Sequence, residues 1–136
     1  MALEQYVSWS EIDSIVKILS DTIAKSSRTF SSISTLSRGG LVPSRLLADH
    51  LGIKKILVDE KTISSDSLFV DDIYDSGMTF DSIIPKVDDS SKLFFVTLFA
   101  RRGKKYPSQL IYGKMTDNEA YVVFPWDKLE FERSKK

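Results

Sequence analysis

The chain has 136 residues, 42% of them hydrophobic, which is enough apolar surface for one ordinary folded core. Its 19 Lys and Arg residues balance 19 Asp and Glu residues, so it lacks the overall positive field that drives non-specific binding to nucleic acid. It contains no cysteine, which excludes disulfide bonds, a thiolate nucleophile and zinc sites that use cysteine.

No apolar run approaches the roughly 18 residues that indicate a membrane span, and the first residues lack the basic and apolar regions of a secretion signal. A chain without cysteine also suits a reducing compartment. We therefore expect a cytoplasmic protein whose partners are small polar molecules, with no affinity for membranes or nucleic acid.

The first predicted element is an amphipathic helix over residues 8–25. Its apolar residues recur at steps of three and four, the spacing that places side chains on one face of a helix. They are Ile12, Ile15, Val16, Leu19 and Ile23. Ser10 is the candidate N-cap of this helix.

A strand, a glycine turn and a second helix are predicted next. Residues 31–37 have modest strand character, and residues 38–40, Arg-Gly-Gly, form the turn. Pro43 fits the first turn of a helix, and Gly52 is placed as its C-terminal stop.

The remaining elements alternate between strands and a helix. Residues 55–58 and 67–70 are short apolar runs suited to buried strands, and a helix from about residue 78 to 87 follows the second run. Residues 92–100 form the strongest strand pattern, which we place at the centre of the sheet. A further short strand is predicted at residues 120–124.

Strands that alternate with helices predict an α/β fold, in which a parallel sheet is covered by helices on both faces. We expect one domain over residues 1–132 and a disordered tail at residues 133–136. Ligands of such sheets bind at the carboxyl ends of the strands, and both glycine turns of the chain fall at such ends.

The segment 69–79, Phe-Val-Asp-Asp-Ile-Tyr-Asp-Ser-Gly-Met-Thr, is a strand that leads into a helix. Backbone N–H groups and hydroxyls of residues 75–79 could cradle a phosphate monoester, and Gly77 permits close approach of the backbone. Asp71 and Asp72 offer adjacent carboxylates to vicinal hydroxyls or to Mg²⁺. Together these residues predict a sugar 5-phosphate site; the alternative is a polar turn with ordinary helix capping.

Residues 70–79 resemble the phosphoribosyl-diphosphate motif of the type I phosphoribosyltransferase family. The resemblance continues in order through residues 36–53, 94–101 and 121–127, which look like bacterial xanthine-guanine phosphoribosyltransferases. It implies transfer of a 5-phosphoribosyl group from phosphoribosyl diphosphate to a 6-oxopurine such as guanine, xanthine or hypoxanthine, with Mg²⁺ as cofactor. It also implies a phosphoribosyltransferase-type fold and a homodimer or higher homo-oligomer.

The resemblance implies roles for the residues that would bind the donor. Asp71 and Asp72 resemble the acidic pair that contacts the ribose hydroxyls, with Asp72 at the metal, and Asp75 resembles the catalytic carboxylate that assists proton transfer beside the purine N7. The other donor-binding residues belong to the 5-phosphate loop and the pyrophosphate loop: Ser76, Gly77, Met78 and Thr79, and Ser37, Arg38 and Gly39. Taken alone, the residues around Arg38 could equally form an ordinary turn.

For the purine, the resemblance adds three residues to Asp75. Tyr121 would stack on the base and the Val122 backbone would read its edge; the alternative for Tyr121 is a core aromatic residue on a strand. Arg101 stands where the family has a Lys that donates to the 6-oxo group, and the larger, forked guanidinium is not equivalent to an ammonium. Arg102 offers a rival alignment, so the preferred base stays open.

Family members cover the site with a long mobile hood loop between the second and third strands, which excludes water. Here the hood loop is shortened to residues 59–66. Two functions therefore remain: an active purine phosphoribosyltransferase, or a module of the same fold that binds a nucleotide or phosphoribosyl diphosphate without turnover. A third alternative is an unrelated flavodoxin-like or Rossmann-like domain with a chance Asp-Asp turn.

Overall fold

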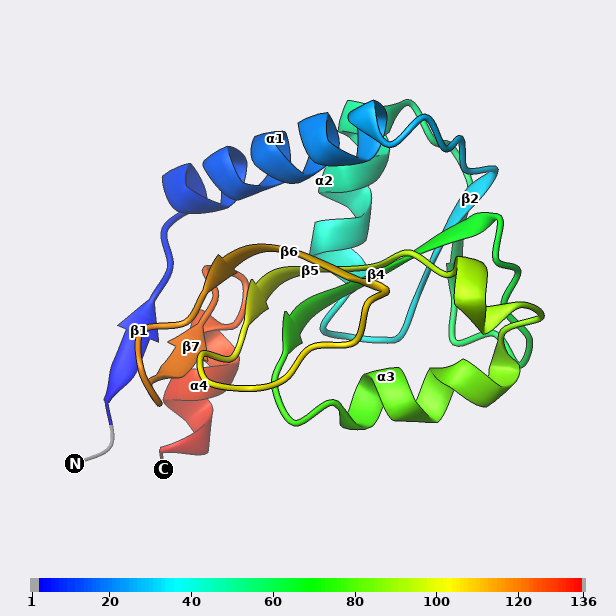
Figure 1. Ribbon diagram of the computed structural model, residues 1–136. Coiled ribbons are helices and arrows are strands. Elements are labelled where there is room, and N and C mark those ends of the chain that lie inside the picture. The colour runs from blue at the N-terminus through cyan, green and yellow to red at the C-terminus, as the bar shows by residue number, and fades with distance from the viewer. Residues whose placement is uncertain (1–2, 136) are drawn as a thin grey trace.

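In the computed structural model, which describes residues 3–135, a five-stranded parallel sheet has the strand order β3-β2-β4-β5-β6 (Figure 1). Its strands are β2 (Ser32–Thr35), β3 (Ile56–Val58), β4 (Ser67–Tyr74), β5 (Phe95–Ala100) and β6 (Leu110–Met115). A second parallel sheet pairs β1 (Glu4–Tyr6) with β7 (Tyr121–Val123). The predicted α/β class with a parallel sheet is confirmed.

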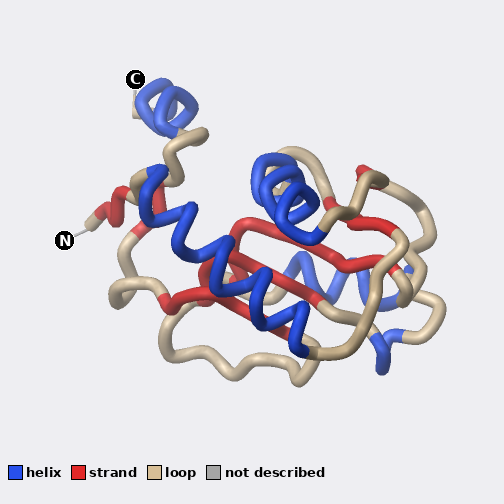
Figure 2. The backbone as a smooth tube through the Cα atoms, turned by 90° about the horizontal axis from the view of Figure 1, so that it is seen from above, coloured by secondary structure: helices blue, strands red, loops and turns tan. Residues whose placement is uncertain are grey.

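Helices cover both faces of the main sheet, as predicted (Figures 1 and 2). α1 (Trp9–Lys25) and α2 (Leu41–Leu51) lie on one face, and α3 (Met78–Ile83), continued by a 3-10 turn at Ile84–Lys86, lies on the other. A Cβ on Gly113 of β6 would lie 2.4 Å from Cγ2 of Ile15, so glycine allows α1 to approach the sheet closely. Each face buries its own apolar cluster.

Three local predictions need correction. The α1 N-cap is Ser8, whose side chain accepts a hydrogen bond from the Glu11 amide at 3.1 Å, rather than Ser10. β4 does not end at residue 70, because its ladder with β5 continues to Tyr74, so the acidic pair lies inside a paired strand. β5 begins at Phe95 and lies between β4 and β6, which makes β4 the central strand.

Four elements were not predicted: β1, β6, a short 3-10 helix at Ser90–Lys92 and the C-terminal helix α4 (Lys128–Ser134). The tail expected at residues 133–136 does not begin at Arg133, since that residue and Ser134 are helical; residue 136 lies outside the described residues. Figure 2 shows α4 beside the main sheet rather than over it. Among residues 3–135, no helix is long and apolar enough to cross a membrane.

The hood loop, residues 59–66, is short as predicted and is tied to the body of the protein. Both carboxylate oxygens of Asp59 accept hydrogen bonds from Ser37, from its amide at 2.9 Å and its hydroxyl at 2.5 Å. Ile63 is buried and pairs with the backbone around Val87. The Ser65 amide donates to the Asp88 carboxylate at 2.8 Å. The loop therefore acts as a packed crossover between strands, not as a free cover.

Candidate active site

A cleft of about 310 Å³ lies beside the carboxyl ends of β2 and β4. Almost all predicted donor-binding residues line it: Ser37, Gly39, Asp71, Asp72, Asp75, Ser76, Gly77, Met78 and Thr79. Arg38 instead lines a groove of about 690 Å³, together with Tyr121 and α4. Gly39 and Asp72 line both hollows, so the cleft and the groove adjoin.

The acidic pair is held by its own backbone. The Asp72 amide donates to Oδ1 of Asp71 at 2.9 Å, and the Ile73 amide donates to Oδ1 of Asp72 at 2.8 Å. Each carboxylate thus keeps its Oδ2 free of these backbone bonds. Burial raises the pKa of both carboxyls, and the neighbouring charge of Asp71 adds to the effect of burial at Asp72.

This donor set fits Mg²⁺, which is commonly held by one or two protein carboxylates together with substrate phosphates. A cation next to Asp71 and Asp72 would favour their charged forms, which burial disfavours. Within residues 3–135 no group of three or more metal-ligating side chains occurs, so the protein would supply only part of the coordination shell.

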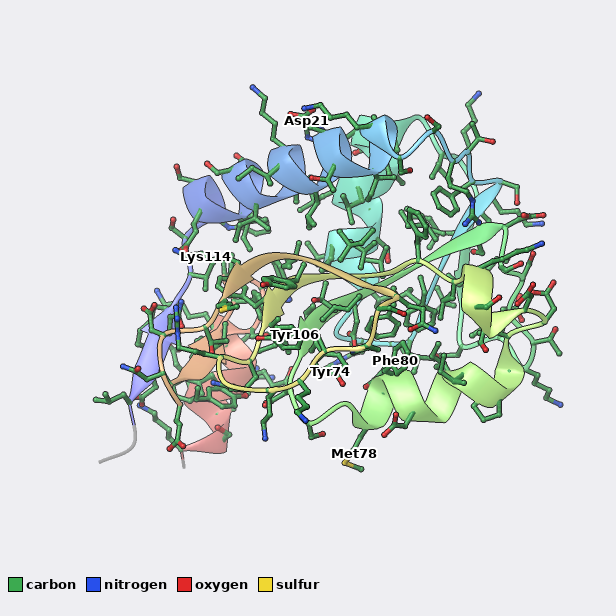
Figure 3. The ribbon with its side chains drawn as sticks, in the orientation of Figure 1. Asp21, Tyr74, Met78, Phe80, Tyr106 and Lys114 are labelled. Carbon is green, nitrogen blue, oxygen red and sulfur yellow. The ribbon has the colours of Figure 1, made fainter. Side chains whose placement is uncertain are left out.

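Residues 75–77 form the turn between β4 and α3, and Met78 and Thr79 begin α3. Gly77 has φ +87°, and a Cβ at this position would lie 2.7 Å from the Tyr74 hydroxyl, so the turn requires glycine. The Ser76 and Gly77 amides donate to no acceptor in the described part of the chain, which leaves them available to a phosphate. Met78 projects away from the sheet and is 75% exposed, as expected if only its backbone contributes (Figure 3).

Arg101 and Asp75 form a forked ion pair. Nε of Arg101 lies 3.0 Å from Oδ1 of Asp75, and Nη2 lies 3.3 Å from Oδ2. Nη1 donates to the carbonyl oxygen of Ala120 at 2.6 Å and lies 3.5 Å from the Thr116 hydroxyl. Arg102 is turned to the Thr116 carbonyl instead, at 3.0 Å. Of the two rival arginines, Arg101 is therefore the one that contacts another predicted site residue.

An aromatic row on the α3 face supports this part of the site (Figure 3). Tyr74 meets Phe80 and Tyr106 edge to face, at ring distances of 6.4 and 5.8 Å. The Tyr106 hydroxyl donates to the Arg101 carbonyl oxygen at 2.6 Å. The row thus fixes both the turn after β4 and the backbone that carries Arg101.

Tyr121 is 58% exposed, so the alternative of a core aromatic residue is wrong. Its ring stacks on Phe131 of α4 with centroids 5.4 Å apart and planes 21° apart. Val122 is buried and pairs with Gln5 of β1. The structure brings Tyr121 to the groove beside Arg38 but places Val122 in the wall of neither hollow.

Sequence reasoning assigned no site role to several groove residues, among them Asp127, Glu130 and Phe131. Burial, with the charges of Asp72 and Glu130, raises the pKa of Asp127 to about 6. Glu130 accepts a hydrogen bond from Nη2 of Arg38 at 2.7 Å. The run of helix formers after Asp127 was a sequence signal for α4 itself, but no sequence pattern indicates which residues α4 contacts.

Comparisons with known proteins place these features in a family context. No protein-family model matches the chain. The xanthine-guanine phosphoribosyltransferase of Chromohalobacter salexigens is 27% identical over an alignment of 153 positions, which covers 93% of this chain and 89% of that protein.

Two solved structures have the same fold. The xanthine-guanine-hypoxanthine phosphoribosyltransferase of Helicobacter pylori has a TM-score of 0.74 at 17% identity, covering 96% of this chain and 99% of that one. The purine phosphoribosyltransferase of Pyrococcus horikoshii has a TM-score of 0.72 at 22% identity, covering 90% and 93%. The chain therefore has the type I phosphoribosyltransferase fold, and the predicted resemblance to xanthine-guanine phosphoribosyltransferases is confirmed.

Proposed function

We propose that this protein is a purine phosphoribosyltransferase, which transfers a 5-phosphoribosyl group from phosphoribosyl diphosphate to a 6-oxopurine and releases pyrophosphate. The observation that carries the proposal is the cleft that unites Ser37 and Gly39 with residues 71–79 and adjoins the groove of Tyr121. The relatives found by sequence, named xanthine-guanine phosphoribosyltransferases, support the same substrate class.

On the donor side, each group has a matching partner in the cleft. The free Ser76 and Gly77 amides and the Thr79 hydroxyl suit the 5-phosphate. Asp71 and Asp72 suit the ribose hydroxyls and would hold Mg²⁺, which neutralises charge on the diphosphate. The loop that contains Ser37, Arg38 and Gly39 would bind the pyrophosphate.

In the reaction, the bond from the ribose C1′ to the pyrophosphate oxygen breaks and a bond from C1′ to N9 of the purine forms. The proton that the purine gives up passes from N7 to the Asp75 carboxylate. Of the five N–H donors of Arg101, four make the contacts with Asp75, Ala120 and Thr116. One N–H, on Nη2, remains for the 6-oxo group of the base.

The direct test is an assay of the purified protein with phosphoribosyl diphosphate, Mg²⁺ and each of guanine, xanthine and hypoxanthine. The nucleotide product is separated by chromatography, and a parallel series replaces Mg²⁺ with a chelator. We expect a nucleotide with at least one purine, and only with Mg²⁺. No product with any of the three bases would reject the proposal.

A binding module without turnover is the second candidate, and two observations favour it. The hood loop is fastened to the body of the protein through Asp59 and Ile63, and Asp75 is engaged by Arg101. Calorimetric titration with phosphoribosyl diphosphate and with GMP, combined with the purine assay, separates the candidates, because a module binds at least one of these compounds and gives no product in the assay.

The proposal keeps the other expectations from the sequence: one domain over residues 1–132, a homodimer or higher homo-oligomer, a cytoplasmic location, and no nucleic-acid or membrane partner. Light scattering of the purified protein measures the oligomeric state. A monomer that turns over purines would remove the need for a partner chain to complete the site.

A further inference from the structure

The helix α4 is attached to the rest of the protein mainly by surface contacts. It has 7 residues, none of them buried. Two ion pairs hold it, one at a residue within the helix, from Arg38 to Glu130 at 2.7 Å, and one at the residue after it, from Lys135 to Glu4 at 3.3 Å. The side chains of Arg38 and Glu130 are 76% and 67% exposed, and such exposed pairs contribute little to stability. On leaving its position, α4 would lose these two ion pairs and the ring contacts of Phe131 with Tyr121 and Tyr6, at centroid distances of 5.4 and 6.2 Å.

Two contacts of α4 fall on residues that we assign to the ligand. The ring of Phe131 lies on Tyr121, the proposed stacking platform for the purine. The carboxylate of Glu130 lies on the guanidinium of Arg38, a proposed pyrophosphate contact. One helix thus presents an aromatic ring and an anion to the same two groups that an aromatic base and a phosphate would use.

Phe131 occupies one face of the Tyr121 ring, and a ligand that stacks on this face has to displace it. The Tyr121 and Phe131 rings are 5.4 Å apart. A purine between them would need a separation of about 7 Å, because each stacked face requires roughly 3.5 Å. Glu130 also adds a third carboxylate to a groove that already contains Asp72 and Asp127, which opposes an incoming anion.

We propose that α4 competes with the ligand inside the protein. Phe131 occupies the face of Tyr121 on which the purine would stack, and Glu130 occupies the Arg38 guanidinium that would bind pyrophosphate, until the ligand displaces them. The identity of the ligand rests on the proposed function, whereas the competing contacts do not. Phe131 and Glu130 then lower the affinity for the ligand by occupying Tyr121 and Arg38, and α4 moves away from these residues when the ligand binds.

The first test compares Glu130→Gln with Glu132→Gln, which removes the same charge from the same helix at a residue outside the groove. By calorimetry with Mg²⁺ and inorganic pyrophosphate, we expect Glu130→Gln to bind roughly two- to fivefold more tightly than the wild type, and Glu132→Gln to bind like the wild type. Phe131→Ala should bind GMP about three- to tenfold more tightly. Unchanged or weaker binding by Glu130→Gln and Phe131→Ala overturns the proposal.

Trypsin provides a second readout that needs no turnover, since α4 contains Lys128 and Arg133. Cleavage at these residues should become faster when pyrophosphate and Mg²⁺ are added to the wild type, and in Glu130→Gln without ligand. Slower cleavage with ligand would mean that α4 closes over the site, and an unchanged rate would mean that it stays in place; either result overturns the proposal.

The two hypotheses fail in different ways. If Glu130→Gln binds pyrophosphate more tightly but no purine is converted, the hypothesis that α4 competes with the ligand is supported and the proposed enzymatic function is rejected. If purines are converted and Glu130→Gln has the same KM for the donor as Glu132→Gln, the proposed enzymatic function is supported and the hypothesis that α4 competes with the ligand is rejected.

Discussion

The donor side and the base side of the site are built in different ways. The donor side comes chiefly from one continuous segment, residues 71–79, which begins in the central strand of the main sheet. The base side is collected from three separate segments, Arg101, Tyr121 and α4. Tyr121 and α4 are largely exposed, whereas the Arg101 side chain is only 12% exposed. Under the proposed function, the core would position the donor, whereas surface segments would set access for the base.

Asp75 stands where the two sides meet, and its replacement should have the largest effect. We expect Asp75→Asn to lower kcat by about 100-fold or more, because the amide cannot accept the purine proton. The affinity for phosphoribosyl diphosphate, measured by calorimetry, should change far less. Asp81→Asn on α3 is the control, since Asp81 is outside the cleft. A fully active Asp75→Asn would leave Asp75 only the role of anchor for Arg101.

Substitution of Gly77 should distort the turn on the donor side of the site. Gly77→Ala should raise the KM for the donor roughly tenfold, because φ is +87° and the added Cβ would meet the Tyr74 hydroxyl. Gly103→Ala is a matched control: φ is +84° there, but no atom lies within 4 Å of the added Cβ. Both variants should lose about 1 kcal/mol from backbone strain. Equal KM values would show that Gly77 matters only for folding.

The same difference explains what the sequence could predict. That the proposed donor residues lie together could be predicted, because carboxylates, glycine and hydroxyls occur in one run of the sequence. The length of β4 could not, since Asp71 and Asp72 are poor strand formers and only pairing with β5 extends the strand through them. Gly113 similarly interrupts the strand pattern of β6, although the close approach of Ile15 requires it.

The base side depends on contacts between distant residues, which no local pattern records. β1 has three residues and exists as a strand only through its pairing with β7 near the other end of the chain. The Arg38–Glu130 pair joins residues 92 positions apart. Sequence reasoning therefore proposed Arg101 and Tyr121 by resemblance but could not foresee that Asp75 and Phe131 engage them.

Arg101→Lys sharpens the comparison on the base side. An ammonium cannot fork onto Asp75 and reach the Ala120 carbonyl together, so the Asp75 carboxylate should become free to take the purine proton. We expect kcat to rise roughly three- to tenfold, with the donor KM unchanged. Arg102→Lys, assayed in parallel, should have little effect. The reverse pattern would favour the rival alignment, in which Arg102 contacts the base.

The smallest expected effect concerns Asp59, which joins the hood loop to the donor side. Its hydrogen bonds from the Ser37 hydroxyl and amide lower the pKa of the Asp59 carboxyl. A lowered pKa means that the stabilisation is present above the ordinary pKa of Asp and is lost as pH falls through the lowered value. We expect Asp59→Asn to reduce Tm by roughly 2 °C at pH 7, and the difference from the wild type to shrink as pH falls below the ordinary pKa of Asp.

Asp66→Asn is the control for this change, because the Asp66 carboxylate accepts no hydrogen bond within the described part of the chain. Asp59→Asn should also weaken pyrophosphate binding, since Ser37 is no longer held at the cleft, whereas Asp66→Asn should not. If the hood loop carried no part of the donor side, both variants would bind pyrophosphate like the wild type. The donor side would then end at the strands, and the loop would serve only as their connection.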